Sequence, residues 1–138
     1  MIILICKVVF LIILLYNNGG GYDMEIKDSI LIRIEDKDIV NGKCVIPAGV
    51  TTIGKEAFAN QENLKFVYIP SSVTIIGERA FSNCRGLESI VIPNSVTYIG
   101  ESAFGFCEKL KKITLSNNIT KILDGTFEFC ESLRNITI

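Results

Sequence analysis

The side chains with the most obvious chemistry are three cysteines that stand at a constant spacing. Cys84, Cys107 and Cys130 follow one another at a constant 23-residue step. A thiolate can act as a nucleophile or bind a metal, and two thiols can form a disulfide. Zinc sites, however, use ligand pairs about two to four residues apart, and three thiols in one column cannot all pair. Because free cysteine is among the most buried residue types, we expect a column of buried, reduced thiols.

The composition argues against an enzyme. The sequence contains no His, the side chain most used as a general base near neutral pH and the commonest neutral metal ligand. We therefore expect no catalytic residue, no metal and no cofactor. The 14 basic and 15 acidic residues nearly cancel, so no large field of one sign attracts nucleic acid. Four lysines lie close together in the sequence, but acidic neighbours dilute their charge and we expect a solvated surface there: Lys109, Lys111, Lys112 and Lys121.

The same step relates four long segments of the chain. Residues 50–54 (Val-Thr-Thr-Ile-Gly) are followed at this step by residues 73–77, 96–100 and 119–123. A fixed period is typical of a solenoid, in which stacked repeats bury a shared core. The period predicts four repeats, the last of them incomplete and uncapped: residues 50–72, 73–95, 96–118 and 119–138.

Each repeat contains the pattern L-x-x-L-x-L, as in Leu87, Ile90 and Ile92, which is the strand of a leucine-rich repeat. Alternation along a strand sends the fourth and sixth positions inward and the third and fifth outward. Prolines at positions 70 and 93 end the strand because proline has no amide to donate to a ladder. A second short strand follows at residues 73–76, and the apolar spacing of residues 78–84 suits one helical turn. The predicted fold is a leucine-rich-repeat solenoid of the α/β class, with short parallel strands and a one-turn helix in each repeat.

These residues resemble the BspA-like leucine-rich repeats, whose pattern is roughly I-P-x-S-V-T-x-I-G-x-x-A-F-x-x-C-x-x-L-x-x-I. Residues 92–100 read Ile-Pro-Asn-Ser-Val-Thr-Tyr-Ile-Gly, and Ala103, Phe104 and Cys107 follow at the matching places. The resemblance covers residues 46–138. It implies a surface-exposed or secreted binding and adhesion module, although some such proteins are intracellular and a fold does not by itself fix a function.

Residues 24–49 precede the first full repeat and are expected to form an N-terminal β cap. Four isoleucines alternate with polar neighbours, which predicts strands with one buried face against the first repeat: Ile26, Ile30, Ile32 and Ile34. Residues 44–49 match the strand end of a repeat. At the other end, residue 138 falls inside a predicted strand, which leaves an apolar cross-section where a capping repeat is normally required. Continuation in a longer chain, self-association at that edge and a truncated gene all stay open.

Residues 1–23 combine an apolar stretch with a Gly-rich linker. Residues 1–16 are apolar apart from Lys7 and resemble a secretory signal, with small residues at Gly19 and Gly21 for cleavage. The stretch is shorter than the roughly 20 residues of a stable membrane span. The alternative is that translation starts at Met24 and the segment is not translated. The first hypothesis predicts a secreted or cell-surface protein, and the second a cytoplasmic one.

The outward positions of the main strand column form the candidate ligand-binding surface: Phe66, Tyr68, Ser89, Val91, Lys112 and Thr114. Exposed apolar patches often mark interaction sites. We therefore expect a non-enzymatic module that binds a protein or glycan ligand there, with surface adhesion as its biological role. The alternative for Phe66 and Tyr68 is that they pack on the N-terminal cap. The alternative for the whole chain is a structural, self-associating segment of a longer protein.

Overall fold

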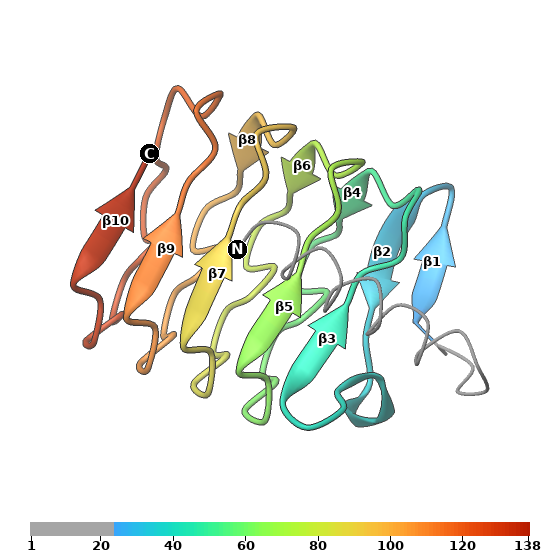
Figure 1. The fold of residues 1–138 in the computed structure, drawn as a ribbon, viewed down its shortest axis with the longest axis horizontal. Helices are drawn as coiled ribbons and strands as arrows, with labels where there is room; N and C mark the ends of the chain where they lie inside the picture. The colour runs from blue at the N-terminus through green and yellow to red at the C-terminus, as the bar shows by residue number, and fades with distance from the viewer. Residues whose placement is uncertain (1–23) are drawn as a thin grey trace, which may run out of the picture.

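The computed structural model describes residues 24–138, which form a β-solenoid of about five coils. Two layers of short strands face each other across one core (Figure 1). The front layer consists of β3 (Lys43–Val45), β5 (Phe66–Tyr68), β7 (Ser89–Val91), β9 (Lys112–Thr114) and β10 (Asn135–Thr137). The back layer consists of β1 (Glu25–Lys27), β2 (Ile30–Arg33), β4 (Thr52–Ile53), β6 (Ile75–Ile76) and β8 (Tyr98–Ile99). The predicted solenoid of stacked parallel strands is confirmed.

The strands stack in the register of the sequence period. Ser89 lies opposite Lys112 in the front layer, and Ile75 lies opposite Tyr98 in the back layer. The predicted alternation is confirmed, because Ile90 and Ile92 are each only 2 % exposed while the residue between them points outward. Strands β5 and β7 both end before the prolines that were expected to end them.

Phenylalanines and thiols form two columns in the core. The rings of Phe58, Phe81 and Phe104 stack with centroid distances of 4.7 Å and 5.2 Å, and none of the three is exposed. Beside them, the Cys84 thiol donates to the carbonyl oxygen of Phe58 at 3.0 Å, and the Cys107 thiol donates to that of Phe81 at 3.2 Å. The expected column of free thiols is therefore present, buried at these two positions and half-buried at the third.

The predicted helical turn at residues 78–84 is not formed. Arg79 and Asn83 have φ angles of 51° and 61°, in the left-handed region, and such residues interrupt a helix. The amide of Phe81 donates to the carbonyl of Ala103 in the next coil at 2.8 Å, and the amides of residues 79 and 83 also donate to the next coil. Apolar spacing alone could not distinguish a helix from this third ladder, because both bury the same side chains. Within the described residues the helical content is one 3-10 turn, η1 (Asp36–Asp38).

The coils approach each other so closely at one corner that only glycine fits. A Cβ atom on Gly77 would lie 2.9 Å from the backbone of Gly54, and one on Gly100 would lie 2.5 Å from the amide nitrogen of Glu78. The fourth repeat has Leu123 at this position. There the back layer ends at β8, and residues 121–123 form no strand. We attribute the loss of pairing to this side chain, which cannot enter the space that the corner glycines leave.

The segment 24–49 contains a coil of the solenoid as well as an edge strand. Strand β2 pairs in parallel with β4, β3 pairs in parallel with β5, and β1 closes the back layer as an antiparallel strand. The buried face expected from the alternating isoleucines is confirmed at Ile34, which is 2 % exposed, and is wrong in register within β1 and β2. Leu31 is fully buried opposite Ile53, whereas Ile26 and Ile32 are 40 % and 38 % exposed. Residues 30–32 are all apolar, so alternation could not decide which of them points inward.

The hypotheses of a signal segment and of a start at Met24 concern residues 1–23, which lie outside the described residues. In the part of the chain that the structure describes, we find no helix with the length and apolarity of a membrane crossing.

Candidate ligand-binding surface

The structure places all six predicted residues on the outward side of the front layer. Phe66 and Tyr68 come from β5, and the other four come in pairs from β7 and β9: Ser89 and Val91, Lys112 and Thr114. Parallel pairing sets β7 directly beside β9, so these four side chains form adjacent rungs. The structure thus brings residues that are far apart in sequence onto one surface.

A hollow of about 540 Å³ opens on this surface over β3, β5 and β7. Most of the residues that line it are apolar. Those with outward side chains are Val45, Phe66, Tyr68 and Val91, together with Pro93 at the strand end, whereas Cys44, Val67, Ile69 and Ile90 border the hollow as buried core residues. The polar lining residues are Lys43, Ser71 and Ser89. Lys112 and Thr114 do not line the hollow and lie beside it on β9. The sequence analysis missed Val45, although one step of the repeat back from Tyr68 reaches it.

The pairing of the front layer is incomplete inside this hollow, between β5 and β7, which stay joined where they begin by the bond from the Glu88 amide to the Lys65 carbonyl at 3.0 Å. At the end of β7, the Ile92 amide donates to the Thr114 carbonyl of β9 at 2.8 Å, and β9 is joined to β10 in the same way. The equivalent bond between β3 and β5 runs from the Ile46 amide to the Tyr68 carbonyl. Among the described residues no such bond connects the Ile69 amide to the Val91 carbonyl, and β5 and β7 belong to different sheets. Among the bonds that residues 24–138 make with one another, one backbone donor and one backbone acceptor beside the hollow therefore have no partner.

The rings of Phe66 and Tyr68 are flanked by the first coil. Phe66 lies opposite Lys43 and Tyr68 lies opposite Val45 on the neighbouring strand β3. The two aromatic residues nevertheless stay 39 % and 40 % exposed. Packing on the N-terminal segment, which was the alternative for these residues, therefore covers them only in part.

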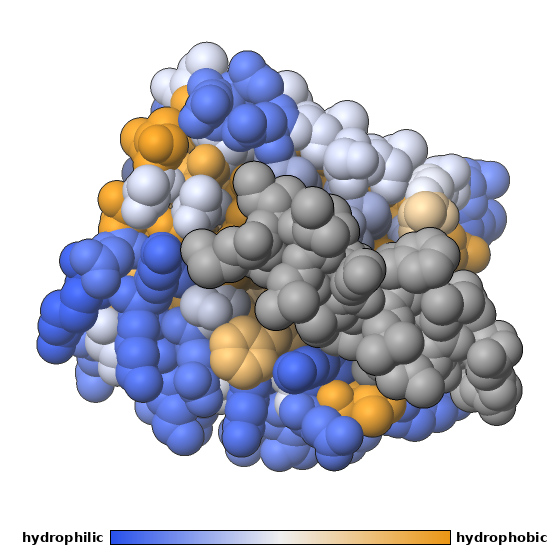
Figure 2. Space-filling view, viewed as in Figure 1, coloured by the Kyte–Doolittle hydropathy of each residue, from blue (hydrophilic) through white to orange (hydrophobic). Residues whose placement is uncertain are grey.

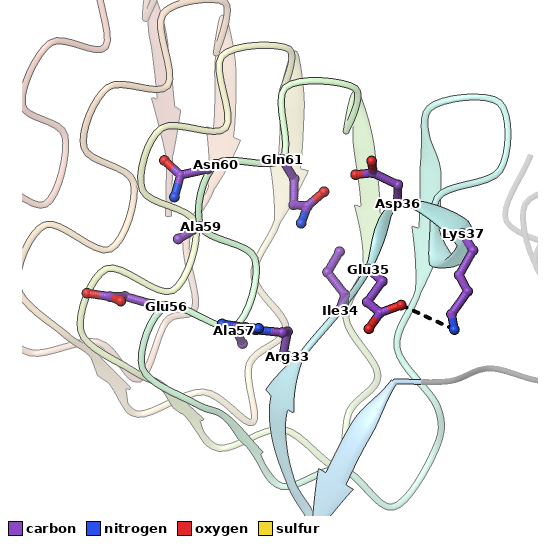
Figure 3. Close-up of a pocket in the computed structure, with 10 residues that line it drawn as sticks. All are labelled: Arg33, Ile34, Glu35, Asp36, Lys37, Glu56, Ala57, Ala59, Asn60 and Gln61. Atoms are coloured by element: carbon purple, nitrogen blue, oxygen red, sulfur yellow. Dashed lines mark ion pairs between the residues drawn. The ribbon is translucent and has the colours of Figure 1, made fainter.

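A second, polar hollow of about 530 Å³ lies between η1 and the first turn of the repeats (Figure 3). It arises because η1 leaves the ladder that joins later coils, after the Ile34 amide has bonded to the Ala57 carbonyl at 3.1 Å. Its charged groups are largely paired already, since Lys37 contacts Glu35 at 3.2 Å and Glu56 contacts Arg79 at 3.7 Å. No sequence motif indicated this hollow, which depends on the departure of one short segment from the period.

Three of the four described thiols are poorly placed for nucleophilic chemistry, because their pKa values are raised. Burial raises the pKa of Cys84 to about 12, and burial together with the charge of Asp38 raises the pKa of Cys44 to about 12. A side-chain hydrogen bond with Cys130 and burial also raise the pKa of Cys107, whereas that same hydrogen bond lowers the pKa of the half-buried Cys130. Among the described residues, no three cysteines or carboxylates gather as a metal-binding group.

The raised thiol pKa values predict that stability falls in alkali. The unfolded chain loses the Cys44 and Cys84 thiol protons near pH 9 and the folded chain near pH 12, so between these values the unfolded state binds fewer protons. The contribution is complete below about pH 9 and is lost as pH rises toward about 12. We expect the urea concentration at the unfolding midpoint to decrease as the pH is raised from 8 to about 10.5.

The control is a chain in which both thiols are replaced, Cys44→Ala and Cys84→Ala. Its urea midpoint should depend less on pH over the same interval. Equal pH dependence in the two proteins would contradict the assignment to these thiols.

Comparison with known families agrees with the geometry of the coils. The sequence model described as "BspA type Leucine rich repeat region" matches residues 40–138 in six copies. The chain belongs to the BspA-type leucine-rich-repeat family. The match begins before the first repeat expected at residue 50, in the segment that contributes strand β3 to the front layer.

Two solved structures of leucine-rich-repeat proteins resemble this BspA-type chain at low sequence identity. One is a leucine-rich repeat protein from Eubacterium ventriosum, with a TM-score of 0.63 and 27 % identity over 80 % of this chain and 36 % of that chain. The other is a leucine rich cell surface protein from Faecalibacterium prausnitzii, with a TM-score of 0.57 and 32 % identity over 78 % of this chain and 34 % of that chain. The BspA-type chain thus spans about a third of the length of these two proteins. No curated protein matched the sequence.

Proposed function

We propose that this BspA-type repeat protein is a non-enzymatic interaction module that binds a protein or glycan ligand on its front layer. The proposed contacts are Phe66, Tyr68, Ser89, Val91, Lys112 and Thr114. The observation that carries the proposal is the apolar hollow of about 540 Å³ over β3, β5 and β7. A well-formed apolar hollow with a few polar groups is the usual form of a binding site.

The chemistry of the available side chains supports the non-enzymatic part of the proposal. The sequence has no His, and burial holds the pKa of Cys84 far above neutral pH. Leucine-rich-repeat proteins are generally non-enzymatic and serve as interaction or structural modules. We therefore assign the front layer to recognition.

We further propose that the module acts at the cell surface or after secretion, in adhesion. BspA-type repeats are often surface proteins in bacteria, and one of the two similar structures is described as a cell surface protein. The proposed cellular location makes macromolecules outside the cell the natural ligands.

The test compares the front layer with a matched pair of residues on the back layer. A peptide library displayed on phage and a glycan array are screened with the protein, and each binder is measured again with the variant Phe66→Ser/Tyr68→Ser. We expect this variant to lose the binders. The control Ile75→Ser/Tyr98→Ser should keep them, since these residues are 39 % and 50 % exposed on the opposite face.

Two results would contradict the proposal. Binders that are lost equally with the back-layer variant would not use the front layer. If the front-layer variant melts at a much lower temperature while binding per folded molecule is unchanged, Phe66 and Tyr68 are structural residues.

The alternative is a structural segment that self-associates through the fourth repeat. Ile136 and Ile138 are 52 % and 79 % exposed there, and β10 has no partner on its outer side among the described residues. An unpaired strand edge is a template for another strand. Sedimentation at high protein concentration tests this, and a strictly monomeric protein would rule it out.

A further inference from the structure

Basic side chains collect where the front strands begin, although the whole chain has a net charge of −1. The first residue of each front strand and the residue before it make ten positions over β3, β5, β7, β9 and β10. One of these ten residues, Glu88, is acidic, and five are basic: Lys43, Lys65, Lys111, Lys112 and Arg134. The local formal charge is therefore five minus one, or +4. We call Lys65, Lys111, Lys112 and Arg134 the basic rim.

The charge of the basic rim is not neutralised within the described residues. Lys65, Lys111 and Lys112 are exposed and take part in no ion pair there. On the turn side of the solenoid, by contrast, Lys55 contacts Glu78 at 3.1 Å and Arg85 contacts Glu108 at 3.2 Å. The rim therefore leaves a positive potential at the surface of a nearly neutral protein.

The rim borders the apolar hollow. Lys65 directly precedes Phe66, which lines the hollow, and Lys112 lies opposite Ser89, which also lines it. Figure 2 shows hydrophilic side chains gathered at the lower left of this face, where Figure 1 places the beginnings of the later front strands. A ligand that fills the hollow must therefore lie within reach of the rim.

We infer that the front layer binds an acidic polypeptide segment, in which one large apolar side chain enters the hollow and neighbouring carboxylates contact the basic rim. This inference rests on the proposed function and names its ligand class. Charge complementarity of this kind steers association and selects partners. The Ile69 amide and the Val91 carbonyl have no partner within residues 24–138, and they add a donor and an acceptor that the backbone of the segment can satisfy.

The lining of the hollow favours a polypeptide over a glycan. The lining side chains that can hydrogen-bond well to sugar hydroxyls are those of Lys43, Tyr68, Ser71 and Ser89. The other lining side chains offer no strong donor or acceptor. Hydroxyl groups that enter without partners lose the hydrogen bonds that they make to water. A Phe or Leu side chain enters the same space without that cost.

Strand geometry sets the spacing of the segment. Neighbouring rungs are about 4.8 Å apart, and an extended chain advances about 3.3 Å for each residue. The distance from the gap between β5 and β7 to Lys112 on β9 corresponds to between one and two rungs. The carboxylate should therefore stand about two residues from the apolar anchor.

The test uses three synthetic peptides with one central Phe, flanked at the second position on each side by Glu, by Gln or by Lys. Fluorescence anisotropy measures their affinities for the full chain at low and high salt. We expect the Glu peptide to bind about ten times more tightly than the Gln peptide, the Lys peptide not to bind, and high salt to remove the advantage of Glu. Lys112→Glu should weaken the Glu peptide about fivefold or more, whereas Lys121→Glu, an exposed lysine outside the front layer, should leave it unchanged.

Failure of this inference differs from failure of the proposed function. If the Gln peptide or a neutral glycan binds as tightly, with loss in Phe66→Ser/Tyr68→Ser but no effect of Lys112→Glu, the acidic ligand is overturned and the binding surface stands. If the Glu peptide binds equally to Phe66→Ser/Tyr68→Ser, the hollow takes no part and the inference is overturned. Both substitutions of lysine are at exposed positions, and circular dichroism verifies that the variants are folded.

Discussion

Replacing Phe104 with Ala should lower the free energy of unfolding by about 3–5 kcal/mol. The side chain is fully buried and stacks on Phe81 and Phe127 at centroid distances of 5.2 Å and 5.8 Å. Truncation removes ring contacts on both sides and leaves a cavity between two coils. In a solenoid each coil is stabilised mainly by its neighbours, so the loss affects two interfaces at once. Urea unfolding followed by circular dichroism measures the change.

The matched control is Phe127→Ala in the next coil. Phe127 is only partly buried, and its one ring contact in the described column is with Phe104. We expect it to cost clearly less than Phe104→Ala. Equal losses at the two positions would contradict the view that stacking on both sides carries the energy.

Replacing Gly100 with Ala should destabilise the protein by about 1–3 kcal/mol, although only one methyl group is added. The new Cβ would lie 2.5 Å from the Glu78 nitrogen and 2.7 Å from the Gly77 carbonyl carbon. These are backbone atoms, which cannot turn away as a flexible side chain does. Relief requires the coils to separate, which strains the bond from the Gly100 amide to the Ile76 carbonyl, 2.9 Å long. Thermal and urea unfolding measure the loss.

Gly105→Ala is the control in the same repeat. Gly105 is also buried, but an added Cβ would find its nearest neighbours at 3.4 Å or more, which is ordinary contact. This variant should change the stability little. A loss as large as that of Gly100→Ala would show that the general effect of replacing glycine, and not the close approach of the coils, is responsible.

Leu123 shows the same constraint in the natural sequence. It occupies the corner position of the fourth repeat, and residues 121–123 there do not pair with β8 although β10 still pairs with β9. One layer of the solenoid therefore ends a coil before the other. The break lies at the residue that departs from glycine, which supports the close approach as its cause.

The candidate surface was predictable in its residues and unpredictable in its shape. The period and the alternation together placed Phe66, Tyr68 and Val91 outward, because those two rules follow from strand geometry alone. The hollow between them forms where the Ile69 amide and the Val91 carbonyl make no hydrogen bond with each other. Whether two neighbouring coils make such a bond is decided only when they stack. The charge of the rim was underestimated for a similar reason. Lys65 and Arg134 are far from Lys111 and Lys112 in sequence and join them only when the coils stack.

The sequence by itself determined the solenoid, its repeat period, the inward columns and the ends of the front strands. These features depend on which side chains alternate, where proline stands and how often each pattern returns, and all of them are local. Only the tertiary structure decided that residues 78–84 form a ladder of turns instead of a helix, and that Leu31 points inward in place of its neighbours. It also decided that the pairing of the front layer is incomplete between β5 and β7. In the first two cases the local pattern allowed two arrangements, and hydrogen bonds to the adjacent coil selected one. In the third, the bond that would join the Ile69 amide to the Val91 carbonyl is not made among the described residues.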